Sequence, residues 1–134
     1  MNKQQKIENF DPSQPGLADA TIFGLPFTAE ESEIIIIPVP WEVTVSYGAG
    51  ASEGPAAIFD ASFQVDLLHQ DFPELWKLGI YMDEAPEQWA KNSEKYKNIA
   101  QPIIEALENG EDVETFPALM EDLHKVNTAC RTLH

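Results

Sequence analysis

Four consecutive isoleucines, at positions 34–37, place the strongest constraint on how this chain folds. A short run of β-branched side chains without a polar interruption is typical of a strand buried on both faces, as in a parallel sheet. Closely spaced prolines and glycines follow the run and indicate a loop, because these residues end strands and favour turns. They are Pro38, Pro40, Gly48 and Gly50.

The rest of the chain alternates between helical and strand patterns, which predicts the α/β fold class. A helix is expected between two neighbouring strands, so the strands should run parallel with a right-handed crossover. Later apolar residues are spaced by three and four, which predicts amphipathic helices, and Pro102 predicts a kink or break in one of them. We expect strands near 34–39 and 78–82, and helices near 55–62, 87–109 and 116–133.

The first 33 residues are largely polar and are expected to form an extended N-terminal arm. Near its end, Thr28 and Glu31 have the spacing of a capping box, which predicts about one helical turn. Residues 34–134 would form an α/β domain. Two strands cannot bury an isoleucine strand on both faces, so we expect the rest of a larger domain, or like subunits, to complete the sheet.

The chain is strongly acidic: 8 basic residues stand against 23 acidic ones, for a formal net charge of −15. This balance argues against nucleic acids and anionic membranes as partners, because both are bound by clusters of lysine and arginine. A cationic ligand would be attracted, although solubility is the simpler reading of an acidic surface. With one cysteine and no stretch of about 20 apolar residues, we expect a cytoplasmic protein outside the membrane.

The order of residues around the loop is distinctive. It reads Val39-Pro40-Trp41-Glu42, then Thr44, Ser46-Tyr47-Gly48 and Gly50, then Gly54-Pro55-Ala56-Ala57-Ile58. This sequence pattern resembles the first strand and following loop of the ureohydrolases, the arginase, agmatinase and formiminoglutamase family. It is most similar to the agmatinase-type branch. The resemblance implies a three-layer α/β/α arginase-type fold with a parallel sheet, of which this chain would be the N-terminal portion, without the metal-binding segments.

The resemblance also implies an activity. Ureohydrolases are manganese-dependent hydrolases, so the full-length parent would hold two Mn²⁺ ions and hydrolyse a cationic guanidino compound, of the agmatine or arginine type, to urea and an amine. The family's metal ligands lie in Gly-Gly-Asp-His, Asp-Ala-His-x-Asp and Ser-x-Asp-x-Asp segments, and none of these occurs here. We therefore expect no catalytic residue, no metal ligand and no cofactor in this chain, which would be inactive alone. An oligomer is expected by the same resemblance.

The loop from residue 38 to 53 is the expected functional edge, because ligands of open α/β sheets gather beyond the carboxyl ends of the strands. By resemblance, Thr44, Ser46 and Tyr47 would lie at the substrate entrance or support groups behind it. Gly48, Gly50 and Gly54 are better explained by positive-φ turns and close chain approach than by phosphate binding. Trp41 and Glu42 indicate packing and a local hydrogen bond.

The other titratable groups are better explained by structural or surface roles than by catalysis or metal binding. Asp66 and His69 could share a helix face, but a solvated turn histidine is the better interpretation. Cys130 and His134 have i, i+4 spacing, yet two ligands make no structural zinc site, and Cys130 fits an apolar stripe. His124 and the pair Asp83-Glu84 are expected on the surface.

A second class of function remains open. The chain could be a stand-alone acidic interaction module that binds a partner through an exposed sheet edge. A reading frame that continues into Gly-Gly-Asp-His would favour the enzyme, and a stop codon would favour the module. A nucleic-acid mimic is a weaker idea, because the carboxylates are spread along the chain rather than arrayed on one face.

Overall fold

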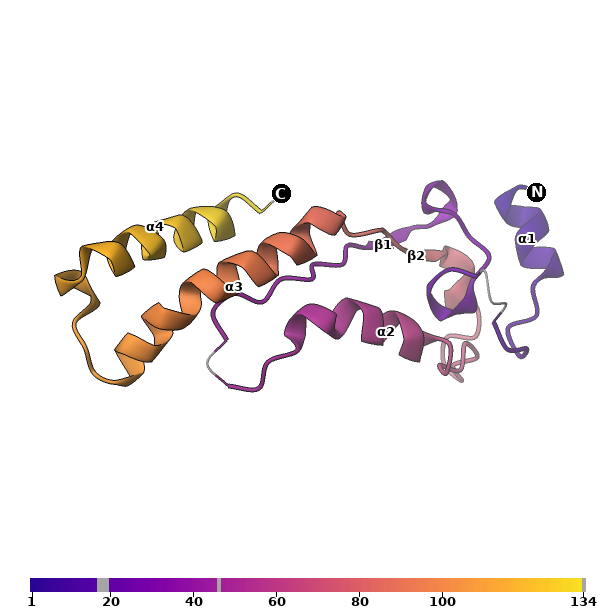
Figure 1. Ribbon diagram of the computed structural model, residues 1–134. Coiled ribbons are helices and arrows are strands. Elements are labelled where there is room, and N and C mark those ends of the chain that lie inside the picture. The colour runs from indigo at the N-terminus through magenta and orange to yellow at the C-terminus, as the bar shows by residue number, and fades with distance from the viewer. Residues whose placement is uncertain (17–19, 46, 134) are drawn as a thin grey trace. The chain divides into compact units, whose positions relative to one another are not determined.

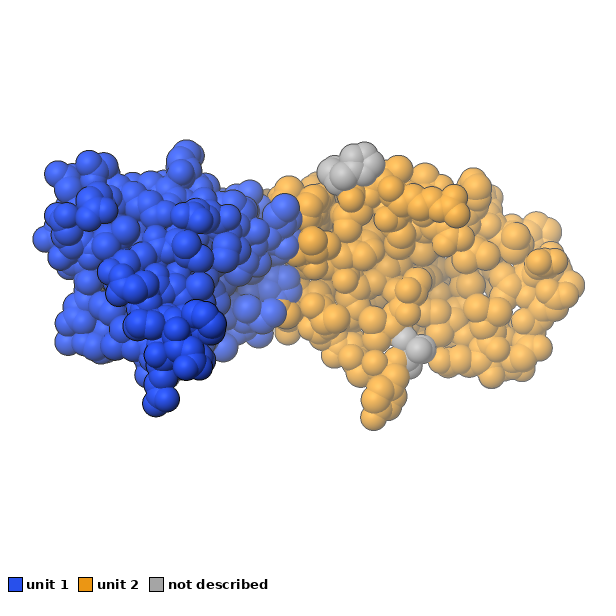
Figure 2. Space-filling model, turned by 180° about the vertical axis from the view of Figure 1, so that it is seen from behind, with its two compact units in different colours: residues 1–38, 55–85 blue, residues 39–54, 86–134 orange. Residues whose placement is uncertain are grey.

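The computed structural model describes residues 1–16, 20–45 and 47–133 (Figure 1). The chain divides into two compact units, coloured separately in Figure 2. The first unit comprises Met1–Pro38 and Pro55–Ala85, and the second comprises Val39–Gly54 and Pro86–His134. In the described ranges, no helix is both long enough and apolar enough to cross a membrane.

The first unit contains a small parallel sheet. Strand β1, Ile34–Ile36, pairs with β2, Ile80–Met82, in parallel, with Ile34 opposite Ile80. The pairing continues at both ends, where the Ile34 N–H donates to Gly79 O at 3.2 Å and the Asp83 N–H donates to Ile36 O at 2.9 Å. Both predicted strands and their direction are confirmed. β1 is shorter than the predicted 34–39, since Pro38 and Pro40 carry no N–H for a ladder.

The isoleucines are not buried on both faces. Ile34 and Ile35 are each 43% exposed and Ile37 is 67% exposed. The described residues form a sheet of two strands with no third strand beside β1, which is too few to bury the isoleucines, so burial by further strands stays a prediction. This part of the chain therefore combines helices with a small two-stranded parallel sheet, which is compatible with the α/β class.

Helix α2, Gly54–Ser62, lies between the two strands in sequence and confirms the helix predicted near 55–62. Its last residue, Ser62, is buried, and its hydroxyl accepts from the Phe23 N–H at 2.9 Å and donates to Phe59 O at 2.6 Å. Phe23 has φ 61°, a left-handed conformation that is rare for a bulky side chain. The end of α2 therefore holds the left-handed turn at Phe23 in place.

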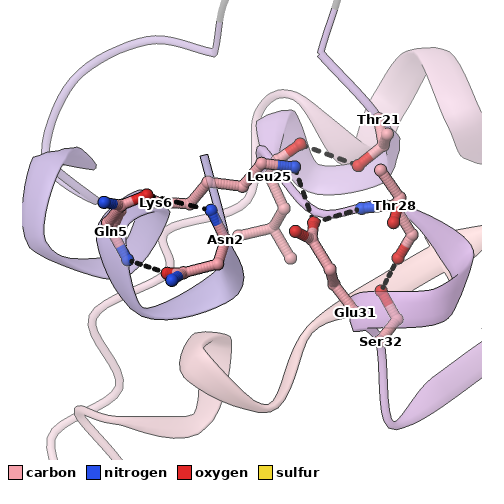
Figure 3. A network of polar contacts seen from close by, with 8 residues as sticks. All are labelled: Asn2, Gln5, Lys6, Thr21, Leu25, Thr28, Glu31 and Ser32. Atoms are coloured by element: carbon pink, nitrogen blue, oxygen red, sulfur yellow. Dashed lines mark hydrogen bonds and ion pairs between the residues drawn. The ribbon is translucent and has the colours of Figure 1, made fainter.

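The N-terminal segment is helical where an extended arm is expected. Helix α1, Lys3–Asn9, begins at a capping box in which Asn2 and Gln5 exchange side-chain and backbone hydrogen bonds. Lys6 on this helix contacts Glu31 at 2.6 Å, and Glu31 also accepts the Thr28 N–H at 3.0 Å (Figure 3). The ammonium of Lys6 and this amide lower the pKa of Glu31. The capping box predicted for Thr28 and Glu31 is confirmed, on the 3-10 turn Ala29–Glu31.

The hydrophobic core of the first unit is built around Trp76. The side chains of Leu25 and Phe27 are completely buried, and Trp76 is 6% exposed. The rings of Phe27 and Trp76 stack with centroids 6.4 Å apart, and Phe10 lies 5.1 Å from Trp76. Residues that precede the first strand are therefore core residues of this unit.

The second unit contains two helices that lie side by side (Figure 1). They are α3, Glu87–Glu108, and α4, Pro117–Arg131, which confirm the predicted helices near 87–109 and 116–133. Of the kink or break predicted at Pro102, the break is wrong, because α3 runs through this residue, and the kink stays a prediction. Buried Ala100 and Ile103 flank Pro102, and their packing compensates for one missing hydrogen bond.

Gly79 provides a test of this fold, because it has a positive φ and lies against another backbone segment. At φ 78°, a Cβ on Gly79 would lie 2.9 Å from both Glu31 O and Ser32 Cα, whereas a Cβ on Gly110, at φ 73°, would meet nothing within 4 Å. We predict that Gly110→Ala costs about 1–2 kcal/mol of left-handed strain and that Gly79→Ala costs more than about 2 kcal/mol. Urea unfolding, followed by amide NMR signals of each unit, measures both losses. Equal losses would contradict the close approach.

Candidate functional site

The loop between β1 and α2 is held by one buried carboxylate. Glu42 is 3% exposed. Its Oε2 accepts from the Gly50 N–H at 2.7 Å and from the Ser52 N–H at 3.2 Å, and its Oε1 contacts Lys97 Nζ of α3 at 2.5 Å. A single side chain thus closes the loop on itself and ties it to a helix.

Ser93 lies one helical turn before Lys97 on α3, and its side chain holds the backbone of Glu42. The Glu42 N–H donates to Ser93 Oγ at 2.7 Å, and that hydroxyl lies 3.3 Å from Glu42 O. Ser93 is itself 3% exposed. We call Glu42, Ser93, Lys97 and the amides of Gly50 and Ser52 the Glu42 clasp.

The electrostatics of the Glu42 clasp favour a charged pair. Hydrogen bonds from Lys97 and from the Gly50 amide lower the pKa of Glu42 to about 2, against the effect of burial. Glu42 in turn raises the pKa of Lys97. A carboxylate with so low a pKa and three donors is a poor proton acceptor, so the geometry assigns Glu42 to loop organisation rather than to acid–base catalysis.

Apolar contacts reinforce the start of the loop. Val43 is 4% exposed and packs with Ala100 of α3 and Val126 of α4. The Trp41 ring lies 6.3 Å from that of Tyr96, between centroids. The predicted packing at Trp41 and hydrogen bonding at Glu42 are confirmed, but the partners Ser93 and Lys97 lie far away in sequence.

Two of the three predicted entrance residues lie in the described part of this loop. Thr44 is exposed and the Tyr47 side chain is 95% exposed, while Ser46 lies outside the described residues. Their role at a substrate entrance stays a prediction. Positive φ is confirmed at Gly48, with 67°, and at Gly50, with 132°, but it is wrong for Gly54, which has a helical φ of −50° because it begins α2. The expected close chain approach is wrong for all three, since a Cβ on any of them would meet nothing within 4 Å.

The other titratable candidates lie in separate places. Asp66 Oδ1 accepts the Leu68 N–H at 2.8 Å and His69 Nδ1 accepts the Asp71 N–H at 3.2 Å, so both belong to turns rather than to one helix face. Cys130 is exposed, which corrects its expected core packing, whereas Val126, four residues earlier on α4, is buried. His134 lies outside the described residues, and the remaining candidates, Asp83, Glu84 and His124, are exposed.

Manganese does not fit the residues that the structure describes. Nowhere in 1–16, 20–45 and 47–133 do three histidine, cysteine or carboxylate side chains come together as metal ligands. The carboxylate with the most hydrogen-bond donors, Glu42, is already occupied by Lys97 and two amides. The described residues therefore show an organised loop and no group of three such ligands, and the two Mn²⁺ ions of a longer parent stay a prediction.

Sequence reasoning missed Ser93 and Lys97 as partners of the loop. Both are polar residues four positions apart on α3, beside the apolar stripe that contains Tyr96 and Ile99. A serine at 3% exposure inside a helix is a recognisable signal only once burial is known, because serine is usually solvated.

The fold and loop define a small α/β arrangement with an organised strand-end loop. A comparison with curated proteins finds 32% identity over 53 residues to N(1)-aminopropylagmatine ureohydrolase of Synechocystis sp. (strain ATCC 27184 / PCC 6803 / Kazusa). The match covers 38% of this chain and 17% of the length of that protein. No protein-family model matches the chain, and neither does any solved structure.

Replacing Glu42 tests the clasp. Glu42→Gln keeps the size but removes the charge opposite Lys97, so we predict a lower unfolding temperature and faster hydrogen exchange at the Gly50 and Ser52 amides. The matched control is Glu121→Gln, which removes an exposed partner of Lys125 on α4 and should leave these amides unchanged. Equal exchange rates in the two variants would contradict the clasp.

The lowered pKa predicts a pH dependence. A carboxylate whose pKa falls from 4.5 to about 2 on folding stabilises the folded state above pH 4.5, and this contribution disappears as the pH falls towards 2. The difference in unfolding temperature between the native chain and Glu42→Gln should therefore be constant above pH 5 and shrink below it. Parallel curves down to pH 2 would rule out the assigned ionisation.

Proposed function

We propose that this chain contributes the first strand and its following loop to a ureohydrolase, an enzyme that hydrolyses a guanidino compound to urea and an amine. The supporting observation is the 32% identity over 53 residues to N(1)-aminopropylagmatine ureohydrolase. The parallel pairing of β1 with β2, and an organised loop directly after β1, agree with such a place in an α/β enzyme. The three-layer arginase-type arrangement is part of this proposal.

The loop has a specific role in the proposed enzyme. The Glu42 clasp fixes both ends of the loop, and the exposed side chains of Thr44 and Tyr47 are then free to contact substrate at the entrance. Ser46 belongs to the same candidate set. A guanidinium or amine substrate is cationic, and a formal charge of −15 would raise its local concentration.

The catalytic metal chemistry would come from elsewhere. The proposed parent binds two Mn²⁺ ions through residues that this chain does not supply, and the rest of the parent domain or like subunits complete the sheet beside β1. We place the parent in the cytoplasm, since the chain has a single cysteine. In this proposal the 134 residues alone bind no Mn²⁺ pair and are inactive.

An assay of urea release tests this proposal. The purified 134-residue chain, supplied with Mn²⁺ and either agmatine or arginine, should release no urea. The protein expressed from the entire reading frame that contains these residues should release urea and lose that activity on chelation. Urea release by the 134 residues alone, or none by the longer protein with any guanidino compound, would contradict the assignment.

A second candidate, an acidic interaction module, is favoured by one observation. Ile34 and Ile35 of β1 and Ile37 just after it are exposed, and an apolar strand with an open edge invites pairing with another chain. The reading frame after His134 distinguishes the two: a Gly-Gly-Asp-His segment supports the enzyme, and an immediate stop codon supports the module.

A further inference from the structure

The first unit contains an apolar pocket of about 400 Å³ that the loop and the proposed activity do not use. Its walls include the aromatic rings of Phe23, Phe72 and Trp76 together with Leu67 and Leu75. Phe72 is 61% exposed and Leu75 is 49% exposed, whereas Trp76 is 6% exposed. The pocket therefore has a buried aromatic floor and an open mouth, with a volume in the range of small-molecule sites.

The backbone at one wall is strained in a defined way. Phe23 has φ 61° and its N–H is held by the buried hydroxyl of Ser62 at 2.9 Å. Strain of this kind persists only where surrounding contacts maintain it, and it is concentrated at ligand-binding positions. Phe23 is thus fixed against the core formed by Leu25, Phe27 and Trp76 before any ligand arrives.

Among the residues that the structure describes, the polar side chains lining the pocket are those of Asp66 and His69. One carboxylate oxygen of Asp66 accepts the Leu68 N–H at 2.8 Å, which fixes the side chain while leaving it exposed. His69 Nδ1 accepts the Asp71 N–H at 3.2 Å, so in the neutral ring Nε2 carries the proton. The nearby Lys77, 5.6 Å from the Trp76 ring, is neutralised by its ion pair with Glu74.

Charge decides which ligands suit this pocket. A fatty acid or another anion would meet Asp66 and a chain of net charge −15, so anions are disfavoured. A cation is attracted by Asp66 and by the faces of the aromatic rings. We propose that the pocket binds a hydrophobic amine, with a hydrocarbon or aromatic body against Trp76 and an ammonium group at Asp66. This site is independent of the proposed ureohydrolase function.

Two probes of the same shape and opposite charge test the proposal. 4-Phenylbutylamine and 4-phenylbutanoate are titrated separately into the 134-residue chain, and amide NMR shifts are recorded. The amine should shift the amides of Leu67, Phe72 and Leu75 saturably and bind about two- to fivefold more tightly than the acid, the range expected of an exposed ion pair. No saturable shift at these amides with the amine, or tighter binding of the acid, would overturn the proposal.

Variants of the pocket test separately how the ammonium group and the apolar body of the ligand are bound. Asp66→Asn should abolish the preference for the amine, whereas Asp71→Asn, which removes an equal charge outside the pocket lining, should preserve it. Leu75→Ser should weaken both probes by a similar factor, because it shortens the apolar wall. Asp66, Asp71 and Leu75 are exposed, so these variants should keep the fold, as their NMR spectra will show. Equal effects of Asp66→Asn and Asp71→Asn would overturn the assigned role of Asp66.

Discussion

A carboxylate that loses its water on burial remains ionised only where other groups replace that water. Around Glu42 this replacement is supplied by the Lys97 ammonium and by the amides of Gly50 and Ser52. The loop conformation of the second unit follows from this requirement, since both amides must point at one oxygen. Positive φ at Gly48 and Gly50 provides the turns that make this possible.

The first unit depends on a different constraint, the packing of N-terminal residues around Trp76. Leu25 and Phe27 are completely buried there, although they precede the first strand and belong to no strand or α-helix. The sheet itself is only partly covered, as the exposure of Ile34 and Ile35 shows. A further strand beside β1 would remove these apolar side chains from water, which is energetically favourable. Both proposed functions therefore give β1 a partner.

Much of the local structure could be predicted because it depends on neighbours in sequence. The capping box at Thr28 and Glu31, the helix after Gly54 and the helices near 87–109 and 116–133 follow from residues a few positions apart. The prediction failed where distant contacts compete with local preference. Pro102 does not break α3, because buried neighbours hold the helix together. The extended arm expected at the N-terminus is wrong for a local reason, since a capping box of Asn2 and Gln5 starts a helix at Lys3–Asn9.

The candidate site likewise has features that the sequence predicts and features that depend on tertiary contacts. The sequence by itself determined the strand-end loop, the positive-φ glycines, the parallel strands and the acidic charge, since each depends on composition or on short spacing. Only the tertiary structure decided that Ser93 and Lys97 hold Glu42, and that Cys130 faces solvent. Burial and pairing between residues about fifty positions apart leave no periodic trace in the sequence, because they depend on how helices pack rather than on local backbone preference.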